Sequence, residues 1–243
     1  MKWNPLRMLC ALAFASILTG CVSMPKQQAF NRETHTTIKT IAVLETHETR
    51  PAVFMMNHPG ANFGLIGGLI AAGDMASKEK KLNALIEQAQ FQPLGYFRER
   101  LTVRMEERGY TLVWPQSQVE KTKASRGTFG LRKAYTGTQG ADAQMDINFG
   151  FFGYAAAGAG DAAPYRPTAT MAVRLVSPDG KQNYYTDYFA YNNVFNMRDA
   201  VAMNADPEFS YPGFDELQAA GPRSVDGLKL AIDSIASEIA RQL

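Results

Sequence analysis

Residues 142–151 alternate strictly between polar and apolar side chains, and this pattern constrains the fold more than any other feature of the sequence. A period of two residues is typical of a strand with one buried and one solvated face. The segment therefore predicts an amphipathic strand with Asp142 and Asp146 on its solvated face. The apolar positions are Ala143, Met145, Ile147, Phe149 and Phe151, and the polar positions are Asp142, Gln144, Asp146 and Asn148.

Further strands are predicted on both sides of this segment. Residues 168–176 and 183–191 have strand patterns, and Pro178-Asp179-Gly180 between them is typical of a hairpin turn. The short β-branched and aromatic runs at residues 38–44 and 110–114 predict two more strands.

Three segments have the apolar period of amphipathic helices, namely residues 74–90, 93–108 and 224–243, with Ser224 as the cap of the last one. Residues 153–164 and 192–222 are expected to be irregular, the first as a mobile or bulged loop. This order predicts an α+β fold with a mixed, largely antiparallel sheet of about five strands, packed by three or four helices.

The first twenty residues have the composition of a secretory signal. A basic start precedes an apolar run from Met8 to Leu18, which is too short to span a bilayer. The run closes with Leu18-Thr19-Gly20-Cys21, and a cysteine directly after small residues resembles the lipobox of bacterial lipoproteins. The resemblance implies that residues 1–20 are removed and that Cys21 carries lipid on its sulfur and becomes the acylated N-terminus.

Removal of residues 1–20 leaves 223 of the 243 residues, with 23 basic residues (25 less Lys2 and Arg7) against 23 acidic ones. This balance argues against a nucleic-acid partner. The cysteines are Cys10, in the signal, and Cys21, so no thiol remains for a disulfide or a metal site. The sequence thus divides into a signal (1–20), a lipidated N-terminus with a flexible tether (21–37) and a single domain (38–243).

Four segments carry a second resemblance: IKTIAVL (38–44), MEERGYTLVW (105–114), ADAQMDINF (141–149) and AVRLVSPDGKQNYYTD (172–187). In this order they resemble the periplasmic lipoprotein domains related to the N-terminal domain of TolB, the curli-secretion lipoprotein CsgG and the lipoprotein activators of penicillin-binding proteins. The resemblance implies a layered α/β fold and a scaffold role in the cell envelope, but no chemistry. The Gly-rich segment 60–73 and the stretch after residue 192 depart from it.

Residues 60–73 form the most unusual internal segment. On a helix, one side would be smooth and the other would carry Phe63, Leu65, Ile66, Leu69 and Ile70. A smooth side lets another backbone approach closely. Three interpretations stay open: a loop or helix packed inside the domain, a face for oligomerisation or a partner, and a segment that lies on or enters the membrane. The glycines proposed for such an interaction are Gly60, Gly64, Gly67 and Gly68.

Tyr184 and Tyr188 share one face of the predicted strand 183–191 and are candidates for an exposed interaction strip, because Tyr is favoured at interfaces. The alternative is an ordinary surface position. The opposite face carries Tyr185, Phe189 and Tyr191 and would belong to the core.

No catalytic residue, metal ligand or cofactor is predicted. The histidines His35, His47 and His58 lack metal-ligand spacing, and we expect them on the surface. Asp142 and Asp146 would lie about 13 Å apart along a strand, too far for a catalytic pair. Neither a nucleophile elbow nor an S-x-x-K pair is found.

The sequence thus predicts a non-enzymatic envelope lipoprotein that binds other envelope proteins or itself. The acyl chains on Cys21 would hold it in the membrane. Val22, rather than Asp, follows Cys21, and by resemblance to sorted lipoproteins this favours the outer over the inner membrane. Two alternatives remain: an envelope hydrolase acting on cell-wall or glycan material, and an oligomeric, membrane-active lipoprotein that uses residues 60–73.

Overall fold

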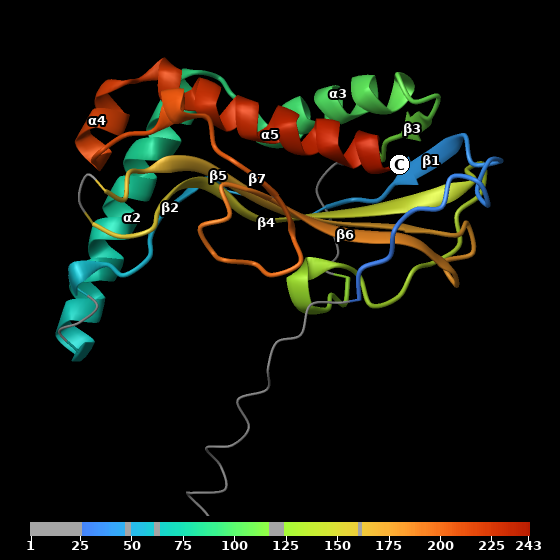
Figure 1. Ribbon diagram of the computed structural model, residues 1–243, viewed down its shortest axis with the longest axis horizontal. Coiled ribbons are helices and arrows are strands. Elements are labelled where there is room, and N and C mark those ends of the chain that lie inside the picture. The colour runs from blue at the N-terminus through green and yellow to red at the C-terminus, as the bar shows by residue number, and fades with distance from the viewer. Residues whose placement is uncertain (1–25, 47–49, 61–63, 117–123, 160–161) are drawn as a thin grey trace, which may run out of the picture.

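The computed structural model describes residues 26–46, 50–60, 64–116, 124–159 and 162–243. Helices α3 and α5 cover one face of a sheet, and α2 and α4 lie at one end of it (Figure 1). The fold is α+β, as predicted.

Its strands are β1 (Thr40–Val43), β2 (Ala52–Met55), β3 (Thr111–Val113), β4 (Ala143–Ala156), β5 (Arg166–Val176), β6 (Asn183–Tyr191) and β7 (Val201–Met203). Its helices are α2 (Gly64–Gln88), α3 (Pro93–Glu106), α4 (Phe214–Ala219) and α5 (Pro222–Gln242), with short 3₁₀ turns η2 (Thr128–Gly130) and η3 (Pro207–Phe209).

The sheet has the strand order β3-β1-β4-β5-β6-β7, with β2 also paired to β4. Its three long central strands, β4 to β6, are antiparallel, and the short outer strands pair in parallel. The predicted mixed sheet is therefore confirmed. It has seven strands rather than about five, because β2 and β7, of four and three residues, lie in segments for which no strand was predicted.

Strand β4 is longer than its alternating segment and runs through the first part of the predicted loop 153–164. It bends at a bulge between Phe149 and Phe152. A bulge adds an unpaired residue, so the two-residue alternation of buried and exposed side chains does not continue through it. Gly153 lies beyond the bulge at φ 149° and faces β2 so closely that a Cβ there would lie 1.8 Å from the carbonyl oxygen of Ala52. A glycine at this position is thus what lets β2 join the sheet.

The main core lies between the sheet and helices α3 and α5. The predicted apolar face of α5 is buried against the sheet, and so are Phe97, Leu101 and Met105 of α3. Helix α5 begins at Pro222, after Gly221 at φ 56°, rather than at a Ser224 cap. The Ser224 hydroxyl instead donates to the carbonyl oxygen of Gly221 at 2.7 Å, inside the first turn.

Residues 26–37 belong to the folded domain, so the predicted flexible tether is wrong for this part of the chain. Gln28 exchanges two backbone hydrogen bonds of 2.9 Å with Thr186 of β6. The Arg32 guanidinium donates to the carbonyl oxygens of Arg241 and Leu243, at 2.6 and 2.8 Å, and so satisfies acceptors that the end of α5 leaves open. Residues 1–25, with the proposed signal and Cys21, lie outside the described residues.

Candidate interaction site at the free end of helix α2

Helix α2 is attached to the body of the domain by its C-terminal half. Leu82 and Ile86 are buried, and Met75 and Leu85 pack against the core. The helix contacts β2, α4 and α5. It begins at Gly64, ten residues before the start predicted at Asp74, so it takes in most of the Gly-rich segment.

The N-terminal half of α2 extends away from the body and presents an apolar surface. In Figure 1 this cyan end of the helix projects beyond the sheet, on the side opposite α3 and α5. Ile66, Leu69 and Ile70 are 73%, 67% and 64% exposed, higher values than for any other large apolar side chain of the described residues. Their spacing of three and four residues places them on one helix face. A contiguous exposed apolar patch of this kind marks an interaction site.

The glycines of α2 lie on the other side of the helix from this patch. The helical period places Gly64, Gly67 and Gly68 in line with the buried stripe of Ala71 and Leu82. Yet a Cβ added to Gly68 would meet no atom within 4 Å. The helix has therefore left the body at this point, and the interpretation that the segment packs inside the domain is wrong.

Gly60 differs from the other glycines because it precedes the helix. Its backbone N–H donates to Nδ1 of His58 at 3.1 Å. Gly60 lies in a short 3₁₀ turn before α2, so of the four glycines only Gly64, Gly67 and Gly68 are placed on one face of the described helix.

A polar cluster holds the chain where α2 leaves the body. Asp74 Oδ2 lies 3.1 Å from Nε2 of His58 and accepts a 2.7 Å hydrogen bond from Lys78 Nζ. Lys78 also donates to the hydroxyl of Tyr165 at 3.3 Å. Burial opposes ionisation of Asp74, but the hydrogen bonds from Lys78 and His58 outweigh it and lower its pKa. The His58 side chain is only 17% exposed, so it is not the surface histidine that was predicted.

The two tyrosines proposed for an interaction strip do not form one. Tyr188 has no exposed surface and packs against Phe129, with ring centroids 5.0 Å apart. Tyr184 is half-buried beside His35, at 4.3 Å. The sequence correctly predicts which residues of the strand share a face. The face predicted to be exposed is covered by residues of two other segments, Phe129 and His35.

The middle of the predicted solvated face of β4 is covered by the segment 126–135, whereas Asp142 at its start is exposed as predicted. Asp146 has no exposed surface. Its Oδ2 accepts from the backbone N–H of Arg132 at 2.7 Å and from the hydroxyl of Tyr135 at 3.0 Å. Its Oδ1 lies 3.5 Å from Nη1 of Arg126. Burial and the neighbouring Asp146 raise the pKa of Tyr135, so its hydroxyl remains a donor.

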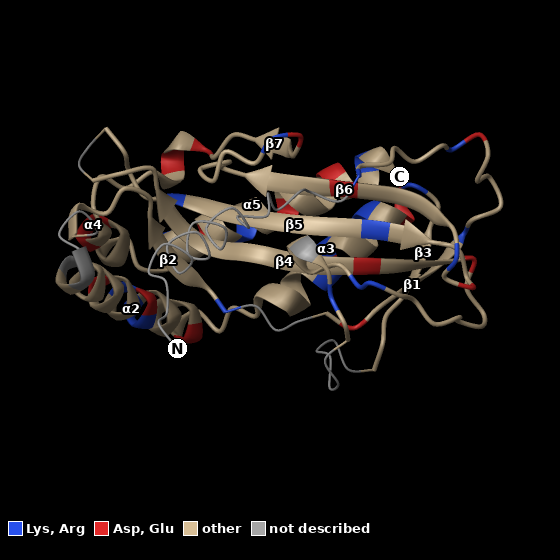
Figure 2. Cartoon of the chain, turned by 90° about the horizontal axis from the view of Figure 1, so that it is seen from below, with Lys and Arg blue, Asp and Glu red and all other residues tan. Residues whose placement is uncertain are grey.

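The charges in this buried layer continue across the sheet. Figure 2, seen from below, shows acidic positions on β4 and β6 on either side of a basic position on β5. The register pairs Asp146 with Arg174 on β5. Asp142 is separate from this group, because its carboxylate accepts the backbone N–H groups of Lys39 and Thr40, which lower its pKa. Each aspartate thus has a structural role, and the two do not form a pair.

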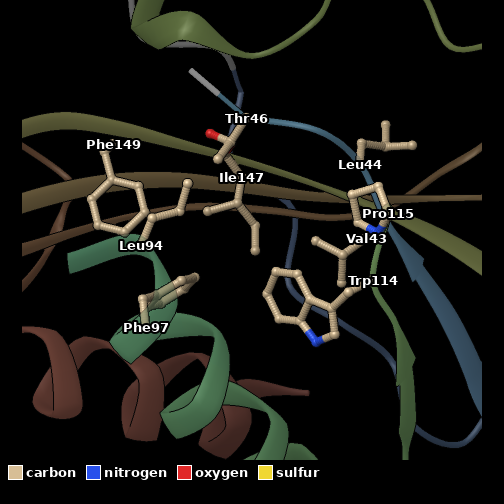
Figure 3. A pocket seen from close by; sticks show the side chains of 9 residues that line it. All are labelled: Val43, Leu44, Thr46, Leu94, Phe97, Trp114, Pro115, Ile147 and Phe149. Atoms are coloured by element: carbon tan, nitrogen blue, oxygen red, sulfur yellow. The ribbon is translucent and has the colours of Figure 1, made fainter. Parts of the chain in front are cut away.

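A small pocket lies between α3 and the sheet, where β1 ends (Figure 3). Leu94 and Phe97 reach it from α3, and Ile147 from β4. Its one hydroxyl, on Thr46, is used in a 2.7 Å hydrogen bond to the carbonyl oxygen of Ile147. The remaining lining residues are Val43, Leu44, Trp114, Pro115 and Phe149. None of the nine can take or give a proton near neutral pH, so the described lining supplies no acid or base.

The described residues contain no group of three His, Cys, Asp or Glu side chains that could hold a metal ion. In the same part of the chain, no helix has both the length and the apolar character to cross a bilayer.

No protein-family model matches the sequence, and no curated protein matches it either. A search of solved structures finds a likeness to the crystal structure of a neuraminyllactose-binding hemagglutinin homolog from Helicobacter pylori. The two share 10% sequence identity over 91% of this chain and 90% of the other, with a TM-score of 0.25. A TM-score of this size is too low to carry an argument about fold or function.

Proposed function

We propose that this chain is a lipid-anchored lipoprotein of the cell envelope, held by acyl chains on Cys21, whose domain binds another envelope component and catalyses no reaction. The proposed location is the periplasmic face of the outer membrane. The observation that carries the binding role is the exposure of Ile66, Leu69 and Ile70 on a helix end that projects from the body. A domain that needed α2 only for its own core would not leave three large apolar side chains in water.

The environment of the buried charges supports a binding role over the hydrolase alternative. Asp146 is the one buried carboxylate among the described residues, and its contacts with Arg126, Arg132 and Tyr135 all fasten one loop to the sheet. A hydrolytic carboxylate needs access to substrate and to water. Asp146 has no exposed surface through which substrate or water could reach it, and it does not line the apolar pocket beside α3.

The anchor is tested by intact mass and by fractionation. We expect protein extracted from outer membranes to have the mass of residues 21–243 plus a diacylglyceryl and an acyl group. In the Cys21→Ala variant the mature lipidated species should be absent. An unmodified N-terminus on the native protein, or recovery in the soluble fraction, would contradict the anchor.

The binding role is tested with a photo-crosslinking amino acid placed in living cells. Position 69 lies in the exposed patch, and Val103 on α3 is a matched control, since it is also an exposed apolar helix residue (41%). We expect adducts from position 69 and few from position 103. Equal yields at both positions would contradict a specific contact at α2.

A further inference from the structure

We propose that the free end of α2 inserts Ile66, Leu69 and Ile70 into the membrane leaflet that holds the acyl chains, so that the domain has a second contact with the bilayer. This inference rests on the proposed lipid anchor. It names the partner of the α2 site as a phospholipid surface rather than a protein.

The size of the patch fits a bilayer better than a protein. Among the described side chains, three large apolar ones are exposed on this helix end, whereas each partner of a stable protein interface contributes roughly 20–30 residues. A lipid surface needs no complementary shape, so a small protruding apolar end is sufficient to enter it.

The length of the uncharged part of α2 matches one leaflet. Residues 64–73 carry no ionisable side chain, and at 1.5 Å per residue they span about 15 Å. The hydrocarbon core of a bilayer is about 30 Å thick. The helix end can therefore enter one leaflet and cannot cross both, which agrees with an insertion that stops where the charged part of the helix begins.

The charges that follow are placed for phospholipid headgroups. Asp74, the first acid of the helix, is held by Lys78 and His58. Lys80 and Lys81 are exposed and lie about 15–17 Å beyond Ile70 along the helix axis. Long Lys side chains can extend toward the interface. Together with Glu79, these residues give the segment 74–81 three positive and two negative charges. The net charge of +1 would give a modest attraction to anionic lipid.

The start of the folded domain also lies on the side from which α2 projects. The blue end of the described chain, which begins at Lys26, lies below the sheet in Figure 1, as does the cyan end of α2. Cys21 is five residues before Lys26, so its Cα can be no more than about 18 Å away. Acyl chains on Cys21 would thus bring the bilayer to the face of the domain where the apolar helix end is exposed.

Depth in the bilayer can be measured with a single fluorescent label. The sequence has only Cys10 and Cys21, so Leu69→Cys gives the mature acylated chain one free thiol. The matched control is Val103→Cys, on the other side of the sheet. Both acylated proteins would be placed in phosphatidylethanolamine–phosphatidylglycerol vesicles and quenched with iodide from water and with brominated acyl chains from the bilayer.

We expect bromolipid to quench the label at position 69 several-fold more than at position 103, and iodide to quench it less. Equal iodide quenching at both positions of a vesicle-bound, acylated protein would overturn the insertion. Shielding from iodide without quenching by bromolipid would also overturn it, since the occupant would then be a protein or a second copy of the chain. Missing acyl mass would instead contradict the anchor, so the two failures are distinguishable.

Discussion

The backbone N–H of Arg132 donates a 2.7 Å hydrogen bond to the carboxylate of Asp146, a side chain with no exposed surface. Together with Tyr135, this contact fastens the segment 126–135 to the face of β4. Asp146→Ala should cost about 3–5 kcal/mol of unfolding free energy, because it removes the buried negative charge beside Arg126 and the acceptor of the Arg132 backbone N–H and the Tyr135 hydroxyl. Asp142→Ala, which removes an exposed carboxylate, should cost only about 1 kcal/mol. Urea unfolding of both variants measures the difference, and equal small losses would refute the buried role.

The close approach of Gly153 to Ala52 gives a steric prediction. Gly153→Ala should cost about 3 kcal/mol or more, because the new methyl group would overlap the Ala52 carbonyl oxygen and the backbone cannot move aside cheaply. Gly73→Ala is the control, since its Cβ would meet open space in a helix and should add about 0.5–1 kcal/mol. Thermal unfolding would show one midpoint falling and the other rising. A neutral Gly153→Ala would mean that β2 does not pair with β4 as described.

Substitution of Gly68 separates membrane insertion from assembly through the glycine face. A Cβ at Gly68 would meet no atom within 4 Å, so Gly68→Leu should leave the fold intact. If the face mediates no self-association, the size of the protein by light scattering in detergent should be the same before and after the change. A wild-type oligomer that Gly68→Leu converts to a folded monomer would favour the oligomeric alternative instead.

Asp74 should make stability depend on pH in the acid range. Its pKa is lowered in the folded protein, so its contribution is fully present above the unfolded pKa of about 3.9. That contribution is lost as the pH falls through the folded pKa, because the protonated carboxyl no longer attracts Lys78. Urea unfolding at a series of pH values should therefore show a weaker acid dependence for Asp74→Asn than for wild type. Asp215→Asn, at an exposed position on α4, is the control, and an unchanged dependence in Asp74→Asn would contradict the assignment.

The elements that could be predicted from the sequence are those in which a regular apolar pattern continues over many residues and one face is buried. The hairpin of β5 and β6 was predicted together with its turn, where Gly180 has φ 74°, and the apolar stripe of α5 is buried as predicted. Strands β2 and β7 were not predicted: β2 pairs with the distant β4 and β7 with the neighbouring β6, and these contacts leave no local pattern in either segment.

The face of β4 that carries Asp146 was assigned wrongly for a different reason. Alternation shows which residues share a face, but it cannot show that a distant loop covers the polar one. Arg126 and Arg132 in a Gly-rich stretch were the available signal, because buried carboxylates are paired with cations.

The candidate site was predicted only in part. Segment 60–73 was singled out by its composition, which is independent of tertiary structure. The exposure of Ile66, Leu69 and Ile70 depends on how far α2 extends beyond β2 and α4, and no local pattern encodes that distance. The cluster of His58, Asp74 and Lys78 was not predicted. Asp74 and Lys78 lie on α2, and His58, which precedes the helix, contacts Asp74 only in the folded chain.

The central claim, that the free end of α2 is a contact site in the envelope, is tested most directly by thiol accessibility. Leu69→Cys and Val103→Cys proteins would be treated with a membrane-impermeant maleimide, once as acylated proteins in native outer-membrane preparations opened to expose both faces and once as the unacylated chain 22–243 in detergent-free, vesicle-free solution. We predict slow labelling at position 69 in the membrane and labelling as fast as at position 103 in the unacylated chain. Equal labelling at the two positions in the membrane would contradict the account.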